Sequence, residues 1–378
     1  MRGHDRPEFI SVDEHVQEPP DLWESRLSKA KWGDRIPHLS RQRDRSERWV
    51  VDGAPLDLPG AASAGALMPE RTREPQRWDE VPPMAYSPAE RLKAMDADGV
   101  DYAVLYPTIA GASGETFGRI TDPELELACV QAYNDWLIEE WAASSDRFIP
   151  QCIVPLYPAE AAAAEIRRAV ALGHRGVIYP SVPMKLRDVP HINEPEYDPI
   201  WSTCQELAVP LCFHSGAAVA GELQPYGMSD AVAGALRNLT RPASTGGVMV
   251  NFLMSGALTR FPELQVVFSE TGLGWATYLL EYADHQFAGD KLAHEGYALT
   301  PSQVFRRQCY VTGWYDQISL KIRHLLGVEN ILWSTNFPLA TSTWPKSWDT
   351  IRGWGEDVTP EDRDRILWRN AAKLYKIS

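Results

Sequence analysis

Polar side chains end four apolar, strand-like runs of the sequence. The runs are 9–15, 209–214, 265–270 and 331–336, and the side chains at their ends are Asp13, His15, His214, Glu270 and Asn336. In a barrel of parallel strands, the carboxyl ends of all strands meet on one face, where active sites lie. A carboxylate and imidazoles that meet there are typical ligands of a divalent metal. The pattern therefore predicts a metal-centred hydrolytic or decarboxylating site.

Asp13 and His15 form the most compact part of this pattern. They stand two residues apart in the first run. Side chains alternate across a strand, so both project to one side while Glu14 projects to the other. Such a spacing is common by chance, and a single histidine at a strand end, such as His214, is more often structural than a ligand. The coincidence of all these residues at strand ends is what favours a site.

Asn336 fits a metal-centred site less well than the other members. An amide oxygen ligates a metal more weakly than a carboxylate because it carries no charge, and an amide cannot act as a general base. The function of the chain therefore depends on what Asn336 does.

Strand-like and helix-like segments alternate along the chain, and the expected helices include 159–172, 198–207 and 247–256. The expected strands are 9–14, 102–107, 148–154, 176–180, 209–213, 264–269, 309–312 and 330–334. Eight strands with helices between them favour a (β/α)8 TIM barrel over an open doubly wound sheet. We expect residues 1–378 to form one such domain. No strand is followed by GxGxxG and no GxxxxGK[ST] occurs, so nucleotide chemistry lacks its usual marks.

A long stretch rich in Arg, Pro, Gly and Ala, about residues 32–88, interrupts this alternation after the first strand. Its clearest element is a possible hairpin at 49–56, where Asp52-Gly53 is a typical turn sequence. Long segments without regular elements are usually functional or interaction surfaces. We expect this insertion to cover the barrel mouth or to form a dimer contact.

The composition argues against several classes of partner. The chain has 378 residues and a formal net charge of −14, which disfavours nucleic acid and anionic membranes as partners. It shows no secretory signal and no apolar run of about 18 residues, so no membrane span is expected. Its five cysteines are scattered and form no CxxC pair. We expect a cytoplasmic protein that acts on a small molecule.

Five motifs together resemble the amidohydrolase superfamily, in the branch typified by aminocarboxymuconate-semialdehyde decarboxylase. They are 12–23 (VDEHVQEPPDLW), 213–216 (FHSG), 260–275 (RFPELQVVFSETGLGW), 330–338 (NILWSTNFP) with 342–345 (STWP), and 369–375 (RNAAKLY). They occur in the family's order, and the resemblance covers the chain except for about residues 32–86. It implies an amidohydrolase-like barrel.

The resemblance also implies roles for individual residues. Asp13, His15 and His214 match metal ligands of the family, and Asn336 stands where a further ligand is normally Asp. Glu270 stands where the family's decarboxylases carry a catalytic histidine, and Leu339 replaces another histidine. The family's chemistry implies a divalent metal, zinc with manganese as the alternative. It also implies non-oxidative decarboxylation or hydrolysis of a small cyclic or aromatic carboxylic acid.

These departures leave three interpretations open. In the first, Asp13, His15 and His214 hold the metal, Asn336 is a weak ligand, and Glu270 is the base. In the second, the metal is lost because Asn336 replaces Asp, and Glu270 works with the two histidines in metal-independent acid–base chemistry. In the third, the chain is a non-catalytic relative that binds a small molecule. We favour the first, with Glu270, His214 and Asn336 as the catalytic groups.

Three further residues are candidates for substrate binding. Trp275 and Trp314 stand next to motif residues and could line a pocket for a cyclic substrate, although most tryptophans pack in cores and interfaces. His191 follows the fourth expected strand and could reach the barrel mouth. We also expect the chain to form a homodimer.

Overall fold

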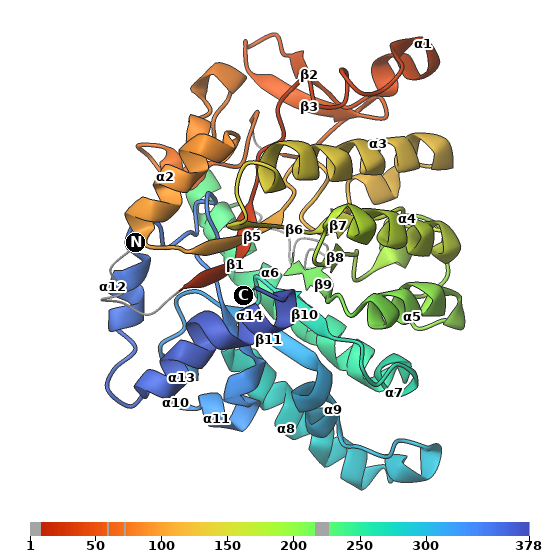
Figure 1. Cartoon of the computed structure of the whole chain (residues 1–378), viewed down its shortest axis with the longest axis vertical. Coiled ribbons are helices and arrows are strands. Elements are labelled where there is room, and N and C mark those ends of the chain that lie inside the picture. The colour runs from red at the N-terminus through yellow and green to blue at the C-terminus, as the bar shows by residue number, and fades with distance from the viewer. Residues whose placement is uncertain (1–8, 59, 72, 216–226, 378) are drawn as a thin grey trace.

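The computed structural model describes residues 9–58, 60–71, 73–215 and 227–377. Within them, eight short parallel strands occupy the centre, and helices lie outside them (Figure 1). In order around the barrel, the strands are β1 (Ile10–His15), β5 (Tyr102–Tyr106), β6 with β7 (Phe148–Pro150 and Cys152–Ile153), β8 (Val177–Ile178), β9 (Leu211–His214), β10 (Val266–Ser269), β11 (Cys309–Gly313) and β12 (Ile331–Trp333). The predicted barrel is confirmed, and each expected strand is present.

Hydrogen bonding divides the barrel strands into two sheets, β1-β5-β6 and β7-β8-β9-β10-β11-β12. Only Gln151 separates β6 from β7, so one segment contributes to both sheets. The other seam, between β12 and β1, is closed by the chain just beyond β12. There His15 N donates to Phe337 O at 2.7 Å, and Asn336 N donates to Asp13 O at 3.2 Å. This closure holds the ends of the first and last strands together.

The helices lie outside the barrel strands (Figure 1). They are α1 (Lys29–Trp32), α2 (Pro88–Asp98), α3 (Pro123–Trp136), α4 (Ala159–Leu172), α5 (Asp198–Leu207), α6 (Asp230–Met254), α7 (Ala257–Arg260), α8 (Gly274–Gly289), α9 (Pro301–Gln308), α10 (Ile318–Lys321), α11 (Arg323–Leu326), α12 (Ser347–Arg352), α13 (Pro360–Asp364) and α14 (Asn370–Tyr375). In α4, small or branched apolar residues such as Ala162, Ile166 and Ala169 form the buried face. This spacing by three and four residues places them on one side of the helix. Among the described helices, none is both long enough and apolar enough to cross a bilayer.

The insertion after β1 forms a small antiparallel sheet of its own. β2 (His38–Arg41), β3 (Glu47–Val51) and β4 (Ala54–Pro55) pair in that order, and Figure 1 shows β2 and β3 beside α1 and α3, outside the barrel. Asp52 and Gly53 form the turn with φ of 51° and 75°, a backbone that Asp-Gly sequences favour in tight hairpins. The expected hairpin is therefore present, whereas β2 was not expected from the sequence.

Candidate active site

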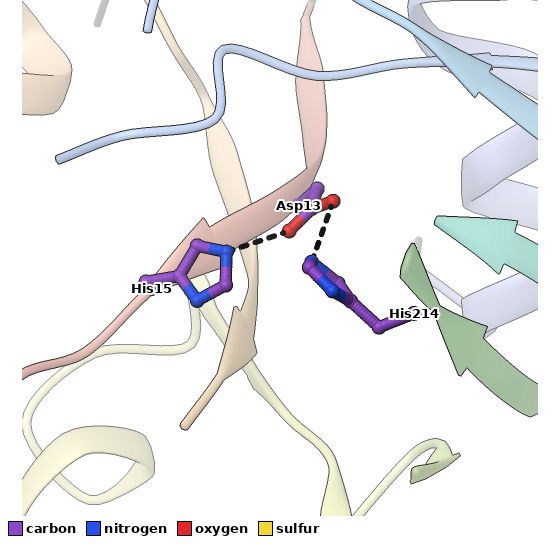
Figure 2. Close-up of side chains that lie close together, drawn as sticks. All are labelled: Asp13, His15 and His214. Atoms are coloured by element: carbon purple, nitrogen blue, oxygen red, sulfur yellow. Dashed lines mark ion pairs between the residues drawn. The ribbon is translucent and has the colours of Figure 1, made fainter. Parts of the chain in front are cut away.

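Asp13, His15 and His214 converge at the carboxyl end of the barrel (Figure 2). His15 Nε2 lies 3.4 Å from Asp13 Oδ1, and His214 Nε2 lies 3.4 Å from Asp13 Oδ2. Each residue offers one possible ligand atom, and these three atoms lie within 4.8 Å of one another. All three side chains are buried. The structure thus brings together three of the four predicted metal ligands, which we call the trio.

The polar atoms of the trio fit a divalent cation. Both carboxylate oxygens of Asp13 and Nε2 of His15 are buried, and none makes a hydrogen bond with the described residues. Burial of such atoms is unfavourable unless a ligand satisfies them. Asp13 Oδ1 lies 3.4 Å from His15 Nε2 and Asp13 Oδ2 lies 3.4 Å from His214 Nε2, and carboxylate and imidazole side chains this close together are typical ligands of one divalent cation. The trio is therefore a candidate divalent-metal site.

Neighbouring groups fix the orientation of the two imidazoles. His15 Nδ1 lies 3.2 Å from Pro107 O, so Nδ1 is the protonated nitrogen and Nε2 remains a possible ligand atom. The ring of Tyr106 packs against both histidines, with centroid distances of 6.0 Å to His15 and 5.2 Å to His214. The Tyr106 hydroxyl is 2.6 Å from Ser269 Oγ. Tyr106 therefore supports both rings from the barrel interior.

Charge interactions couple Asp13 with His214. Burial alone would raise the pKa of Asp13, but the attraction of His214 and His15 holds it below its usual range. Burial opposes protonation of His214, but Asp13, followed by Glu270 and Glu115, raises the pKa of His214. Without a cation, Asp13 is thus a carboxylate that favours a proton on His214. A histidine that ligates a metal must give up such a proton, so binding of a cation here would be coupled to proton release.

Glu14 projects to the opposite side of β1, as the alternation predicts. Its Oε2 lies 3.4 Å from Arg91 Nη1, and its Oε1 accepts a hydrogen bond from Thr335 Oγ1 at 2.5 Å. Arg91 Nη2 also donates to His15 O at 2.7 Å. This buried ion pair ties the strand that carries Asp13 and His15 to α2 and to the turn after β12.

Glu270 follows β10 and lies beside the trio. Its Oε2 is 3.9 Å from His214 Nδ1 and accepts a hydrogen bond from Ser215 Oγ at 2.5 Å. Its Oε1 accepts a hydrogen bond from Asn336 Nδ2 at 3.1 Å. The side chain is buried and lines the cavity described below. The structure therefore places this predicted catalytic residue next to the candidate metal ligands.

Asn336 is brought to the same place by the turn after β12. Its Nδ2 donates to Glu270 and also to Thr341 Oγ1, the latter at 2.8 Å. Its Oδ1 is buried and makes no hydrogen bond with the residues that the structure describes. The amide thus uses its donors on neighbouring side chains and keeps its acceptor available.

A cavity of about 630 Å³ is lined by His15, His214 and Glu270. Residues 51–58 of the insertion, except Gly53, line the same cavity, together with parts of the loop 107–120 and Leu339. This volume lies in the range of pockets that hold small molecules. The hairpin contributes apolar side chains such as Pro55 and Leu56, which suit the face of a ring-shaped substrate.

Two cavity residues were missed in the sequence. Glu115 and Arg119 both lie in the loop after β5 and line the cavity. Glu115 Oε2 accepts a hydrogen bond from Ser113 N at 2.8 Å, and Arg119 Nη1 donates to Glu115 O at 3.0 Å. Their position could have identified them, because the loop follows the carboxyl end of the second strand and active sites of barrels lie at the carboxyl ends of the strands.

The three candidates for substrate binding do not line the cavity that the described residues form. The indole of Trp275 donates to Thr271 O at 2.6 Å, one turn back on its own segment. Trp314 is buried against Tyr315, with ring centroids 4.9 Å apart. His191 is exposed, and its Nδ1 accepts a hydrogen bond from Asn193 N at 3.3 Å. Local packing directs these side chains away from this cavity, and their contact with substrate stays a prediction.

Comparisons with known proteins agree with this geometry. A profile of the amidohydrolase family (Amidohydro_2) matches residues 13–377. Gamma-resorcylate decarboxylase of Rhizobium sp. (strain MTP-10005) is 23% identical over 303 residues, which cover 76% of this chain and 86% of that enzyme. An amidohydrolase of Mycobacterium avium subsp. paratuberculosis has a similar structure, with a TM-score of 0.77 and 21% identity over 98% of this chain and 99% of that chain.

A decarboxylase of known structure also shares the fold. It is 5-carboxyvanillate decarboxylase of Novosphingobium aromaticivorans, solved with bound manganese and 3-methoxy-4-hydroxy-5-nitrobenzoic acid. Its TM-score is 0.69 at 19% identity, over 100% of this chain and 99% of that chain. The resemblance to the decarboxylase branch of the superfamily is confirmed. The chain belongs to the amidohydrolase family and is an enzyme of the amidohydrolase superfamily.

Proposed function

We propose that this amidohydrolase is a carboxy-lyase, which removes the carboxyl group of a small aromatic or cyclic carboxylic acid with the help of a bound divalent cation. The observation that carries the proposal is the trio of Asp13, His15 and His214 beside Glu270. Three of these four side chains, His15, His214 and Glu270, line a cavity of suitable size. Two of the relatives are decarboxylases, and one of them was solved with manganese and a nitrobenzoic acid.

Asp13, His15 and His214 are the proposed protein ligands of the cation, and Oδ1 of Asn336 is a proposed neutral fourth ligand. This oxygen is buried without a hydrogen bond to the described residues, so its lone pairs are available. We propose manganese rather than zinc, because a decarboxylase of the same fold holds manganese and because oxygen ligands suit it. The bound cation would supply Lewis acidity, polarising a substrate oxygen.

Glu270 is the proposed proton-transfer group. Decarboxylation breaks the bond between the ring carbon and the carboxyl carbon. The electron pair of that bond stays on the ring carbon and takes up a proton, while carbon dioxide leaves. Glu270 lines the cavity and would carry that proton on a carboxyl oxygen before recovering another from water. Ser215 and Asn336 orient the carboxyl group through their hydrogen bonds.

Hydrolysis is the second candidate, and one set of contacts favours it. Glu270 accepts a hydrogen bond on each of its oxygens, which is the arrangement of a group that takes a proton rather than one that gives it. In a hydrolase, Glu270 would remove a proton from the water that attacks a lactone or amide carbonyl, and the leaving group would receive that proton.

A substrate panel separates these functions. The protein would be assayed with manganese, and in parallel with zinc, against aromatic and unsaturated carboxylic acids, lactones and amides. Carbon dioxide release with formation of the decarboxylated product supports the carboxy-lyase. Ring opening or amide cleavage without carbon dioxide supports the hydrolase. If no compound turns over and none raises the melting temperature, both functions and the binding alternative are contradicted.

We also propose that the insertion covers the barrel mouth and that the chain forms a homodimer. The contribution of residues 51–58 to the cavity supports the first. Exposed apolar side chains support the second, because large exposed apolar side chains are common at interfaces. Tyr278 and Tyr282, whose rings stack with centroids 6.2 Å apart, are 64% and 50% exposed, and Ile318 is 81% exposed. Sedimentation equilibrium should give twice the mass of the chain, and Ile318→Asp should shift the protein to monomer. A monomer at all concentrations would contradict the dimer.

A further inference from the structure

We propose that Asn336 and Ser215 are positioning residues for Glu270, and that an amide at position 336 is what allows a carboxylate to stand at position 270. The catalytic consequence rests on the proposed carboxy-lyase function. The structural interdependence of the two side chains does not, and it can be tested separately.

Neutral donors from two different strand ends hold the carboxylate of Glu270. Ser215 Oγ, just after β9, donates to Oε2 at 2.5 Å, and Asn336 Nδ2, after β12, donates to Oε1 at 3.1 Å. The backbone of Glu270 is also fixed, because its N–H donates to Thr312 Oγ1 at 2.9 Å. The side chain is therefore constrained at its base and at both oxygens, as a proton-transfer group in a defined position requires.

Asn336 is itself constrained where it meets Glu270. Its backbone N–H donates to Asp13 O at 3.2 Å. Its φ is 58°, in a left-handed region that Asn adopts more readily than most residues. Its Nδ2 donates to Thr341 Oγ1 as well as to Glu270, which occupies both amide hydrogens. Since a carboxylate offers only lone pairs at this contact, the amide nitrogen must face Glu270.

An aspartate at position 336 could not reproduce this contact. It would set two carboxylates at the distance of 3.1 Å that the hydrogen bond now spans, and like charges so close oppose each other. Asp13 already lies 3.4 Å from His214, and Glu270 lies 3.9 Å from the same imidazole. The amide therefore places a donor where a carboxylate would add a third negative charge around His214.

A double-variant cycle tests the interdependence. Asn336→Asp should lower the midpoint of denaturant unfolding, because the two carboxylates repel each other. Adding Glu270→Gln to the same chain should restore the midpoint, because the glutamine amide can donate to the new carboxylate. All variants would be measured with saturating manganese and again with EDTA, so that altered metal affinity is seen separately. If the shifts of the two substitutions simply add in both conditions, the interdependence is overturned.

Kinetics tests the positioning role. Ser215→Ala should lower kcat on the order of 10-fold to 100-fold with little change in KM, and Ser215→Thr, which retains a hydroxyl, should recover most of the loss. Ser347→Ala is the matched control, because Ser347 Oγ is a buried hydroxyl that donates to a carboxylate, Asp98, at 2.5 Å but belongs to α12. The control should lower stability and leave kcat unchanged.

The outcomes separate the two proposals. An unchanged kcat in Ser215→Ala, or an equal loss of kcat in Ser347→Ala, would overturn the positioning role. A chain that shows rescue in the unfolding cycle but turns over no compound would leave the structural pair intact and contradict the proposed function.

Discussion

Asn336 contributes an amide where the resemblance to amidohydrolases leads us to expect a carboxylate, and Glu270 contributes a carboxylate where it leads us to expect a histidine. The two departures compensate each other, since the amide of Asn336 donates to Glu270 at 3.1 Å. The site thus keeps an acidic side chain beside the trio, but carries it after β10 instead of after β12. Asn336 is therefore not by itself a sign that the site has decayed.

Glu270→Gln should abolish most activity and spare the metal. Loss of a group that transfers a proton in the transition state lowers kcat by about 10²-fold to 10⁴-fold. Metal content should stay unchanged, because Asp13, His15 and His214 are intact. Steady-state kinetics and elemental analysis of the same preparation check both. A variant that loses its metal together with its activity would show that Glu270 is a ligand, and an unchanged kcat would remove it from the mechanism.

Glu18 predicts a pH dependence of stability that is separate from catalysis. It is fully buried, and burial raises its pKa from 4.5 to about 7 despite backbone N–H donors at Ile109, Ala110 and Thr108. Because the folded state binds this proton more tightly than the unfolded state does, protonated Glu18 contributes to the free energy of unfolding. That contribution is fully present below pH 4.5 and is lost as the pH rises through about 7. The loss is on the order of 3 kcal/mol.

Glu18→Gln should remove this pH dependence. The free energy of unfolding of the unsubstituted protein should fall, relative to that of the variant, as the pH rises from 4.5 to about 7. Denaturant titrations across this range measure the difference. Glu24→Gln is the control, because Glu24 is nearby in the sequence but exposed, and its profile should follow that of the unsubstituted protein. Parallel profiles for Glu18→Gln would contradict the prediction.

Among the elements, the β3–β4 hairpin lines the cavity and is linked to the barrel helix α3 through Arg35. Residues at its turn and beyond line the cavity. Arg35 forms ion pairs with the hairpin and with the start of α3. Its Nε lies 2.6 Å from Oδ1 of Asp52 in the hairpin turn, and its Nη1 lies 3.0 Å from Asp122 Oδ2. Asp122 is also the N-cap of α3, where it accepts from Glu124 N and Leu125 N. One partly exposed arginine therefore connects the insertion with a barrel helix.

Arg35→Gln should weaken substrate binding more than it weakens the fold. A loosened hairpin should raise KM several-fold with kcat nearly unchanged, which is the signature of lost uniform binding. The melting temperature should change little, because solvent screens partly exposed ion pairs and they contribute little to stability. Arg365→Gln is the control, since Arg365 pairs with Glu329 and Glu361 outside the cavity. A fall in kcat without a change in KM would contradict this role of the hairpin.

The whole barrel is needed to assemble the candidate metal site. Asp13 and His15 come from the first strand, His214 from β9, and Asn336 from beyond the last strand. The backbone hydrogen bonds from Asn336 N to Asp13 O and from His15 N to Phe337 O join the two ends of the chain at this point. A ligand that binds only this assembled site stabilises the complete fold.

Removal of the metal should therefore affect both activity and global stability. EDTA should abolish turnover and lower the melting temperature, and manganese should restore both, because the cation binds the folded state alone. Elemental analysis of protein purified without added metal should find about one divalent ion per chain, as expected for a single-ion site. Activity that survives EDTA in metal-free protein would instead support acid–base chemistry by Glu270, His15 and His214 without metal.

Local patterns predicted the elements well where local interactions decide them. The apolar runs gave the eight strands, and α4 and α5 have the bounds expected from their periodicity and their terminating residues. The helix α6 shows the limit, because only residues 247–256 were expected to be helical and the helix spans Asp230–Met254. Its glycines weaken the local signal, yet Gly246 permits close packing, since a Cβ there would lie 2.7 Å from Leu279 Cδ1.

The sequence by itself determined which side chains stand at the strand ends, and barrel topology then brings such ends together. Asp13, His15, His214, Glu270 and Asn336 were identified in this way. Only the tertiary structure decided which of their atoms meet. It showed that the Asn336 amide donates to Glu270, that the hairpin and the loop 107–120 line the cavity, and that the predicted substrate-binding tryptophans pack elsewhere. These contacts depend on closure between β12 and β1 and on packing between distant segments, which no local pattern encodes.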